Sequence, residues 1–427
     1  MINRLKPKSE FSKNILTLMT GTTIAQAIPI AISPVLTRIY TPEDFGVFAL
    51  FVSITSILGS IANGRYELAI MLPKKDEDAI NIFVLGFIIN VVFSSFIFLF
   101  IIIFHDKILE LLNNKEISPW LYFIPLSVFL MGCFNLLNYF NNRLKNYKDL
   151  AKANIYRSIG MAIVQLSLGF LKAGATGLIS GQIFSQIISN TKLFFNIKNL
   201  NLFRYIYKLK IIALSKKFRD FFFLNTPSAI ADTLTLQLPY ILLPKLYTIN
   251  IAGLYFFANR IIFLPTGLIA GNIGQVFLQK ISYQYQHKEE IMPILRSTFF
   301  KLFQISLIIS SLFFILSPYT FSLIFGSEWE KAGYIAQLLS LTFFIRFIVS
   351  PLSSVFVLKP FVRIGSYWQF LYLFTTLFLF LLCFYLNIDF WKFLYLYIVH
   401  EYILYIIYLA LIFFSIKKYE NLILRRG

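Results

Sequence analysis

Long apolar stretches constrain this chain more than any other feature of its sequence. They follow one another from end to end, separated by short polar connections. Because a helix needs roughly 20 apolar residues to cross a bilayer, the sequence predicts an all-α integral membrane protein with about twelve transmembrane helices. The predicted spans lie near residues 14–36, 46–70, 79–104, 120–142, 151–171, 174–196, 221–244, 252–278, 297–318, 333–357, 364–386 and 390–415.

Composition supports a bilayer as the solvent for most side chains. Hydrophobic residues make up 58% of the chain and charged residues only 14%, whereas soluble domains are about a quarter charged. A net charge of +19 on a soluble protein would suggest a nucleic-acid partner. Here the charges lie between apolar stretches, so we expect them to set membrane orientation and expect no nucleic-acid partner.

The first apolar run resembles a signal peptide, because basic residues precede Ala25–Ala27. The run continues to Leu36, which makes it long enough to span a bilayer. We therefore expect the first run to remain as a transmembrane helix.

Basic residues alternate between rich and poor connections. With the N-terminus inside, 26 of the 39 Lys and Arg lie in inner segments and 7 in outer ones. The inner residues are Arg4, Lys6, Lys8, Lys13, Lys74, Lys75, Arg143, Lys145, Lys148, Lys152, Lys198, Arg204, Lys208, Lys210, Lys216, Lys217, Arg219, Lys280, Lys288, Arg296, Lys359, Arg363, Lys417, Lys418, Arg425 and Arg426. The outer residues are Arg38, Lys107, Lys115, Lys172, Lys245, Lys331 and Lys392. The positive-inside rule then places both termini on the cytoplasmic side of the membrane.

An internal repeat relates the two halves of the chain. Arg38–Thr41 and Lys245–Thr248 share a pattern, and both are followed by a glycine, Gly46 and Gly253, at an offset of 207 residues. The same offset relates Phe48 to Tyr255 and Gly64 to Gly271. Six spans in each half give both halves the same orientation, so they should be related by a pseudo-twofold axis along the membrane normal. The predicted domains are a six-helix lobe 1–196, a basic cytoplasmic linker 197–220 and a six-helix lobe 221–427.

Prolines interrupt the first predicted span of each half. Pro29 and Pro34 lie in one, and Pro227, Pro239 and Pro244 lie in the other. Because proline removes a backbone hydrogen bond, we expect both helices to be broken and to mark the moving elements of a transporter. The alternative is that membrane helices simply tolerate these prolines.

Four segments together resemble a known family. They are Arg38–Gly46, Gly64–Ile70 with Leu72–Pro73, Ala252–Tyr255 with Asn259–Arg260, and Phe325–Trp329 with Ala332–Gly333. These segments resemble landmarks of the bacterial O-antigen flippases, which belong to a superfamily of multidrug, oligosaccharidyl-lipid and polysaccharide exporters. The resemblance covers nearly the whole chain. It implies a V-shaped pair of helix bundles around a polar cavity, and a substrate built from undecaprenyl pyrophosphate and a short glycan. It also implies a glycan polymerase or chain-length machinery as partner.

Charged residues inside predicted spans are the candidate functional residues. A charge at the bilayer centre costs on the order of 3 kcal/mol. The candidate substrate-binding cations are Arg65, Arg157, Arg260 and Arg346. Guanidinium groups can donate paired hydrogen bonds to the oxygens of a pyrophosphate. The alternatives are internal ion pairs, such as Asp232 with an arginine, and for Arg157 a side chain that extends to the headgroups.

Three acidic residues in predicted spans, Glu67, Asp232 and Glu401, are candidates for ion coupling. We expect no bound cofactor. If a proton or sodium gradient drives transport, these acids would bind the coupling ion. The sequence does not choose among them.

Motifs of catalysis and metal binding fail in this sequence. No phosphate-binding glycine loop occurs, and His400-Glu401 is followed by Leu404 where a zinc helix needs histidine. Cys133 and Cys383 both lie in apolar segments, so no disulfide framework is expected and a metal site is unfavoured. The sequence thus predicts a transporter without enzymatic activity. The alternatives are a drug or cation exporter of the same superfamily and, from another class, a membrane glycan polymerase.

Overall fold

The computed structural model describes residues 10–198, 205–358 and 361–424, and these form helices joined by short connections, without a strand. Within this part of the chain, nine helical segments are long and apolar enough to cross a membrane. They coincide with nine of the predicted spans. The other three predicted spans, 151–171, 174–196 and 221–244, coincide with the long helices α7 (Tyr147–Phe170), α8 (Ala175–Ile197) and α10 (Thr226–Leu246). The prediction of an all-α membrane protein is confirmed.

Contacts divide the chain into two compact units, Met1–Gly253 (unit 1) and Leu254–Gly427 (unit 2). The predicted lobes instead divide at a linker, 197–220, of which 199–204 lie outside the described residues. Contacts assign α10 to unit 1 because α10 packs along α3. The division into lobes 1–196 and 221–427 stays a prediction. The predicted inner residues Arg4, Lys6, Lys8, Arg204, Lys359, Arg425 and Arg426 also lie outside the described residues.

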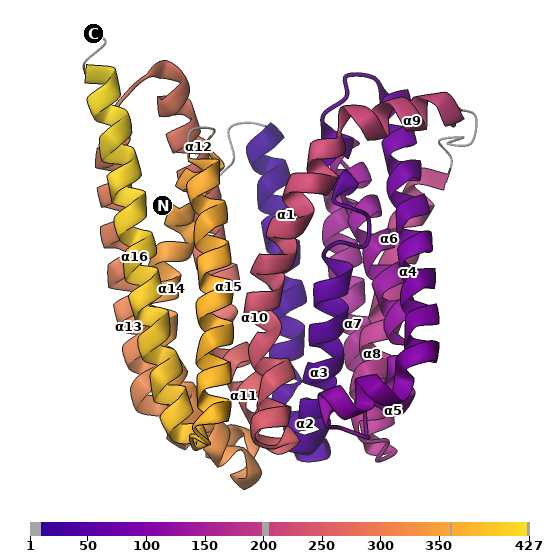
Figure 1. Cartoon of the computed structure of the whole chain (residues 1–427), viewed down its shortest axis with the longest axis vertical. Helices are drawn as coiled ribbons and strands as arrows, with labels where there is room; N and C mark the ends of the chain where they lie inside the picture. Colours follow the sequence, from indigo (N-terminus) through magenta and orange to yellow (C-terminus); the bar gives the residue numbers. More distant parts are fainter. Residues whose placement is uncertain (1–9, 199–204, 359–360, 425–427) are drawn as a thin grey trace. The chain divides into compact units, whose positions relative to one another are not determined.

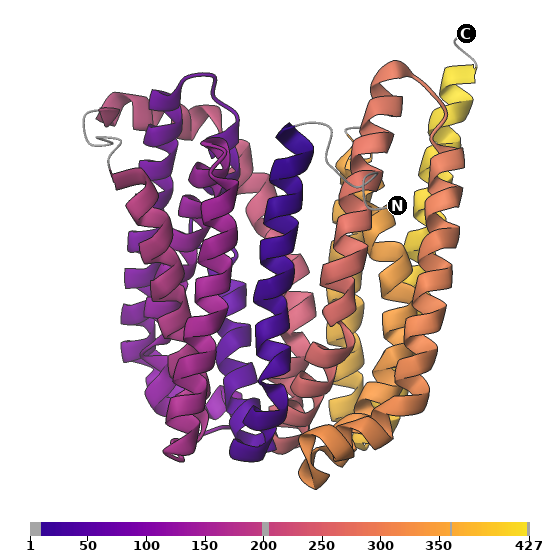
Figure 2. The same cartoon turned by 180° about the vertical axis from the view of Figure 1, so that it is seen from behind.

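Unit 1 is a bundle of long helices (Figures 1 and 2). Besides α7, α8 and α10, its helices are α1 (Glu10–Ala31), α2 (Ser33–Ile39), α3 (Pro42–Gly59), α4 (Asp76–Leu112), α5 (Ser118–Leu121), α6 (Ile124–Arg143), α9 (Lys208–Lys217) and the first turn of α11 (Ile249–Ile262). Helix α6 packs against α3, α4 and α8, and α7 packs against α1 and α8. Helix α9, which forms part of the predicted linker, packs against α4 and crosses the end of the bundle.

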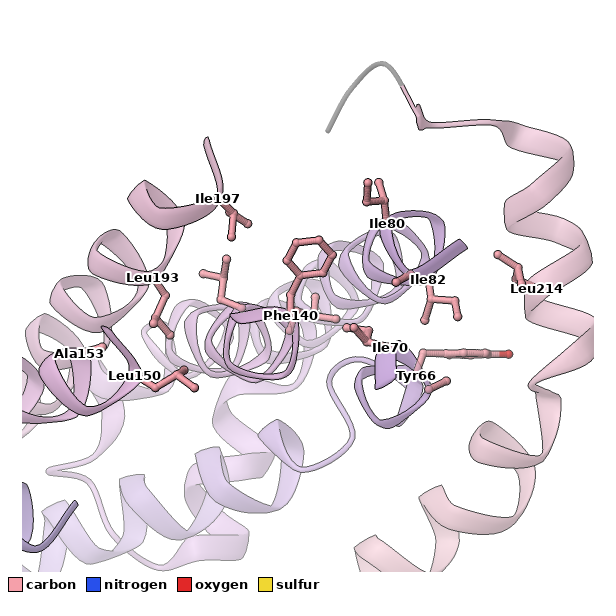
Figure 3. Close-up of a cluster of buried hydrophobic side chains, with 14 residues drawn as sticks. Tyr66, Ile70, Ile80, Ile82, Phe140, Leu150, Ala153, Leu193, Ile197 and Leu214 are labelled. Carbon is pink, nitrogen blue, oxygen red and sulfur yellow. The ribbon is translucent and has the colours of Figure 1, made fainter. Parts of the chain in front are cut away.

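A buried hydrophobic cluster holds this end of unit 1 together (Figure 3). Ile80 and Ile82 of α4, Phe140 of α6, and Leu193 and Ile197 of α8 supply its centre. The Asn81 side chain of α4 also binds the segment before α9. Its amide group donates a hydrogen bond to the Tyr205 carbonyl (2.8 Å) and accepts one from the Tyr207 N–H (2.9 Å).

Unit 2 has α14 at its centre. Besides the rest of α11, its helices are α12 (Gly271–His287), α13 (Met292–Phe325), α14 (Glu330–Leu352), α15 (Val362–Tyr385) and α16 (Phe390–Leu424). Helix α14 packs against α12, α13 and α16, while α15 packs against α16. This arrangement brings the middle of α14, α15 and α16 together.

The predicted second span, 46–70, is wrong as a single helix. Helix α3 ends at Gly59, and a short 3-10 helix, Tyr66–Met71, follows only after a turn. Gly64 and Arg65 have φ angles of 57° and 63° in that turn. Glycine adopts this left-handed conformation without cost, so Gly64 suits the turn that leads from the end of α3 into the 3-10 helix.

The prolines act differently in the two halves. The first predicted span is interrupted, as expected, at Ile32 between α1 and α2 next to Pro34. In the seventh span the α-helix is preceded by a π-helical turn, Phe221–Asn225, next to Pro227. The expected breaks at Pro239 and Pro244 are wrong, because α10 runs without interruption from Thr226 to Leu246 with both inside it. Pro227 lies in the first turn of α10, where the missing N–H has no helical partner in any case.

Equivalent positions of the predicted repeat contact one another within unit 1. The Asn250 amide donates to the Glu43 carboxylate, and these residues are 207 positions apart. A Cβ on Gly253 would lie 2.7 Å from the backbone nitrogen of Gly46, its counterpart at the same offset. The first turns of α3 and α11 therefore meet at backbone contact, with the register that the repeat predicts.

The start of α16 provides a test of pH dependence. Asp389 accepts hydrogen bonds from the N–H groups of Lys392 (3.2 Å) and Trp391 (3.1 Å), and chiefly the Lys392 bond holds the pKa of Asp389 below its ordinary value of 3.8. The ionised cap therefore stabilises the first turn of α16 above pH 3.8, and this stabilisation is lost as the pH falls through the lowered pKa. We expect Asp389→Ala to speed amide exchange at Trp391 and Lys392 at neutral pH, whereas Asp389→Asn keeps an acceptor and changes it less. Equal exchange in Asp389→Ala and the unaltered protein would contradict the capping role.

Candidate functional site

Arg65 and Glu67 lie at the turn between α3 and the 3-10 helix. The left-handed backbone at Arg65 sets its Nη1 atom 3.4 Å from Oε1 of Glu67, whose side chain is only 3% exposed. The same Nη1 donates to the Ser60 carbonyl over a long 3.5 Å. The Nε of Arg65 and the Oε2 of Glu67 are buried without a hydrogen-bond partner among the described residues. Buried polar groups are rarely left in this state, so Arg65 keeps donor capacity for a ligand.

Two further residues complete what we call the Arg65 cluster, made of Arg65, Glu67, Tyr139 and Asp232. The carboxylate of Asp232, on α10, interacts electrostatically with Arg65. Tyr139, on α6, interacts electrostatically with both Glu67 and Arg65. Arg65 and Glu67 come from one turn, Tyr139 from α6 and Asp232 from α10, so three parts of the chain contribute to the cluster. Asp232 forms no ion pair within 4 Å of an arginine among the described residues, so its pairing with an arginine stays a prediction.

Arg157 lies apart from that cluster, on α7. Its guanidinium carbon is 5.2 Å from the centre of the Phe134 ring, a cation–π contact. Its side chain is half-buried, and no carboxylate of the described residues lies within 4 Å of it. Arg157 therefore has an aromatic partner in place of an acidic one.

The central polar group of unit 2 joins α14, α15 and α16. Arg346 donates from Nε to Oε2 of Glu401 at 2.7 Å, and its Nη2 lies 2.6 Å from the same oxygen. The Tyr372 hydroxyl donates to Oε1 of Glu401 at 2.5 Å and accepts from Nη2 of Arg346 at 2.5 Å. Glu401 is fully buried. Both of its oxygens are therefore satisfied, and the Arg346–Glu401 pair is the internal ion pair that the sequence left as an alternative.

Aromatic side chains enclose this ion pair. The guanidinium carbon of Arg346 lies 5.3 Å from the Phe263 ring centre and 5.5 Å from the Tyr405 ring centre. The ring of His400 stacks with those of Tyr372 and Tyr397, with ring centres 6.2 Å and 6.4 Å apart. Both ring nitrogens of His400 are buried without a hydrogen-bond partner among the described residues. The sequence analysis missed these tyrosines. The signal was the spacing of Tyr397, Glu401 and Tyr405, which places three polar groups on one face of a helix.

Arg260 lies in the last turn of α11 and is half-buried, with no carboxylate of the described residues within 4 Å. Of the predicted site residues, the structure therefore pairs Arg65 with Glu67 in unit 1 and Arg346 with Glu401 in unit 2, while Asp232 interacts with Arg65 only at longer range. Arg157 and Arg260 have no acidic partner in the part of the chain described. The roles of all seven residues in substrate binding or ion coupling stay predictions.

A metal centre has no candidate in the described residues, because no three His, Cys, Asp or Glu side chains come together there. Cys133 is half-buried and Cys383 is buried, and both are free thiols.

Comparisons with known proteins place this arrangement in a family. Residues 35–334 match the family model described as polysaccharide biosynthesis protein. The succinoglycan biosynthesis transport protein ExoT of Rhizobium meliloti is 23% identical over 324 residues, which cover 75% of this chain and 63% of that relative.

Two solved structures show the fold. An inward-facing multidrug-resistance MATE transporter of the MOP superfamily aligns with a TM-score of 0.71 at 13% identity, over 94% of this chain and 96% of its own. A MOP-superfamily transporter from Pyrococcus furiosus, described as having a binding pocket of reverse polarity, aligns with a TM-score of 0.67 at 12% identity, over 96% of both chains. The chain is therefore a member of the polysaccharide biosynthesis protein family, and its all-helical fold is similar to that of the solved MATE transporter structures.

Proposed function

We propose that this protein is a flippase that moves an undecaprenyl-pyrophosphate-linked oligosaccharide from the cytoplasmic to the periplasmic leaflet of a bacterial inner membrane. The observation that carries the proposal is a polysaccharide-biosynthesis family match on a chain with a transporter fold. Succinoglycan precursors and O-antigen units would both be lipid-linked oligosaccharides of this kind. Both termini lie in the cytoplasm, and the substrate passes on to glycan polymerase and chain-length machinery.

The Arg65 cluster supplies the chemistry that such a substrate needs. The pyrophosphate is the part of the substrate that hydrocarbon excludes most strongly. The Nη1 of Arg65 forms an ion pair with Glu67 at 3.4 Å. Its buried Nε makes no hydrogen bond within the described residues. A guanidinium group can offer two parallel donors to phosphate oxygens. Arg157 and Arg260, which lack acidic partners in the described part of the chain, add further positive charge in membrane helices. Movement proceeds by alternating access, and Glu67, Asp232 or Glu401 couples it to a proton or sodium gradient.

Deletion of the gene separates this proposal from a glycan polymerase. Loss of a flippase stops export, so no repeat unit should reach the cell surface. Loss of a polymerase would leave single exported units on the acceptor. We expect the deletion strain to lack surface glycan altogether and a plasmid copy to restore it. Single exported units in the deletion strain would overturn the proposal.

A substitution series at Arg65 tests the phosphate-binding role. We expect transport of labelled lipid-linked glycan into inverted vesicles to fall in the order wild type, Arg65→Lys, Arg65→Ala, Arg65→Glu. Lysine keeps the charge but loses the paired donors, and loss of a charge-assisted hydrogen bond of about 1.5–3 kcal/mol corresponds to roughly a 10- to 100-fold loss.

The backbone at Arg65 supplies the control for this series. Because its φ angle is 63°, Arg65→Gly removes the charge while relieving a strained conformation. We therefore expect Arg65→Gly to remain as stable as the unaltered protein and to transport as poorly as Arg65→Ala. Equal transport by the Glu and Lys variants would exclude a phosphate-attracting role.

A further inference from the structure

An apolar groove runs along unit 1, distinct from the Arg65 cluster. Its volume is about 630 Å³, within the range of about 300–1,000 Å³ that small-molecule sites occupy. Helix α6 packs against both α4 and α8 and forms the base between them. The lining includes Ile80 and Phe87 of α4, Phe140 of α6, Thr191 and Phe195 of the second half of α8, and Lys198 directly after α8.

The base of the groove is rigid and its rim is open. Ile80, Leu136, Leu137 and Phe140 are at most 6% exposed and belong to the buried cluster of unit 1. Figure 3 shows Phe140 between Ile197 of α8 and Ile80 of α4. On the rim, by contrast, Phe87, Phe194 and Phe195 are 40–56% exposed. The groove is therefore a preformed channel that opens sideways along membrane-spanning helices.

Its length fits one leaflet. From Phe129 to Phe140, α6 rises about 16 Å at about 1.5 Å per residue. The hydrocarbon core of a bilayer is about 30 Å thick, so the groove extends over about half of it. An occupant that enters from one leaflet can therefore lie along the groove without leaving that leaflet.

The two ends of the groove differ in charge. Lys198 lies at the end of α8, exposed, with its amine 5.0 Å from the centre of the Phe195 ring. It has no carboxylate within 4 Å in the described part of the chain. The rest of the lining offers six phenylalanine rings and aliphatic side chains, with Asn190 and Thr191 as its polar exceptions. Such a site suits one long hydrocarbon chain with an anion at its Lys198 end.

We propose that this groove binds the tail of a polyprenyl pyrophosphate lipid, with the phosphates beside Lys198. A single channel along one helix accommodates one chain, whereas a phospholipid would have to place a second chain outside it. Methyl-branched isoprene units pack against the aromatic walls. This inference rests on the proposed function and deepens it, because the groove holds the carrier in the leaflet from which its polar head enters the transport pathway.

Photocrosslinking tests the groove directly. The full chain in phosphatidylcholine nanodiscs is irradiated with a polyprenyl pyrophosphate that carries a diazirine on its tail and no sugar. We expect adducts in peptides covering 129–140 and 190–198, and competition by unlabelled polyprenyl pyrophosphate. Equal competition by phosphatidylglycerol would overturn the assignment, since the groove would then be a general anionic-lipid site. Adducts spread evenly over exposed positions such as Phe96 would overturn it too.

Matched variants add a second measurement. Thr191→Trp fills the groove from its exposed rim, and Phe96→Trp alters an exposed α4 position outside the lining. We expect the first to weaken probe binding roughly tenfold, a difference of about 1.4 kcal/mol, and the second to leave it unchanged. Lys198→Glu should weaken binding, whereas Lys115→Glu, at another exposed lysine, should not. Equal effects within either pair would contradict the proposal.

Thiol labelling keeps the test independent of folding defects. Cys133 lines the groove while Cys383 is buried in unit 2. The probe should slow the reaction of Cys133 with a membrane-permeant maleimide, whereas the buried Cys383 should react only after denaturation and serves to calibrate full labelling. An unprotected Cys133 would count against the inference. Flipping by the unaltered protein without groove adducts would refute the groove alone. Groove adducts without flipping would refute the proposed function and leave the binding site standing.

Discussion

Gly253→Val is expected to prevent the chain from folding to a stable membrane protein. A Cβ at this position would lie 1.8 Å from the Pro42 carbonyl oxygen and 2.7 Å from the Gly46 nitrogen. Both atoms belong to backbone, which cannot rotate away as a side chain can. Overpacking usually costs about 1–3 kcal/mol and occasionally more, and a backbone clash belongs at the upper end of that range. The yield of monodisperse protein and the thermal unfolding temperature in detergent measure the effect.

Gly271→Ala is the matched control. The nearest atom to a Cβ there is the Thr266 carbonyl oxygen at 3.9 Å, an ordinary contact. Gly271 begins α12, and alanine is a better helix former than glycine by about 1 kcal/mol. We therefore expect Gly271→Ala to keep or slightly raise the unfolding temperature. If Gly253→Val unfolded at the same temperature as Gly271→Ala, α3 and α11 would not meet as described.

Removal of either partner of the Arg346–Glu401 pair is expected to destabilise the protein at least as much as Gly253→Val does. Glu401→Gln leaves the guanidinium group of Arg346 among aromatic rings without a counter-charge. Breaking a buried ion pair in this way typically costs about 3–5 kcal/mol. Arg346→Met should lower the free energy of unfolding by a similar amount. It removes the counter-charge of the fully buried Glu401 and leaves the Tyr372 hydroxyl to donate to that carboxylate. Unfolding in detergent, followed by intrinsic tryptophan fluorescence, measures both changes.

The double variant Arg346→Met, Glu401→Leu decides whether the charges act as a pair. Since it removes both charges together, we expect it to recover most of the stability that each single variant loses. Additive losses would show that each side chain acts through other contacts. If the double variant is stable and still transports glycan, the pair is structural. If it is stable but inactive, the predicted role of Arg346 or Glu401 in transport gains support.

The fold was largely predictable because a bilayer permits few solutions. Backbone groups in hydrocarbon must be hydrogen-bonded within the segment, so apolar runs of sufficient length become helices. The repeat offset was visible as well, since one of its pairs, Gly46–Gly253, marks a close backbone contact that tolerates few residue types. The turn after Gly59 was missed because Ile61, Ala62, Leu68, Ala69 and Ile70 continue the apolar pattern across it. A count of apolar residues does not register the left-handed Gly64 and Arg65.

The site was less predictable because pairing depends on which helix faces meet. The sequence identified Arg346 and Glu401 as charges in predicted spans. It could not show that α14 and α16 bring them to hydrogen-bonding distance, with Tyr372 of α15 completing the group. Tyrosine is common in membrane helices, so Tyr372 and Tyr139 gave no signal by themselves. The groove lined by α4, α6 and α8 was equally hidden, because its residues match the lipid-facing composition of any span.

Flipping in proteoliposomes tests the central claim most directly. The purified chain is reconstituted with a fluorescent undecaprenyl-pyrophosphate-linked oligosaccharide, and a membrane-impermeant reductant bleaches the glycans exposed outside. We predict that lipid-linked glycan becomes fully accessible with time in vesicles that contain the unaltered protein. In protein-free vesicles and in vesicles with Arg65→Glu, only the outer leaflet should bleach. The same slow, partial bleaching with and without the unaltered protein would contradict the account.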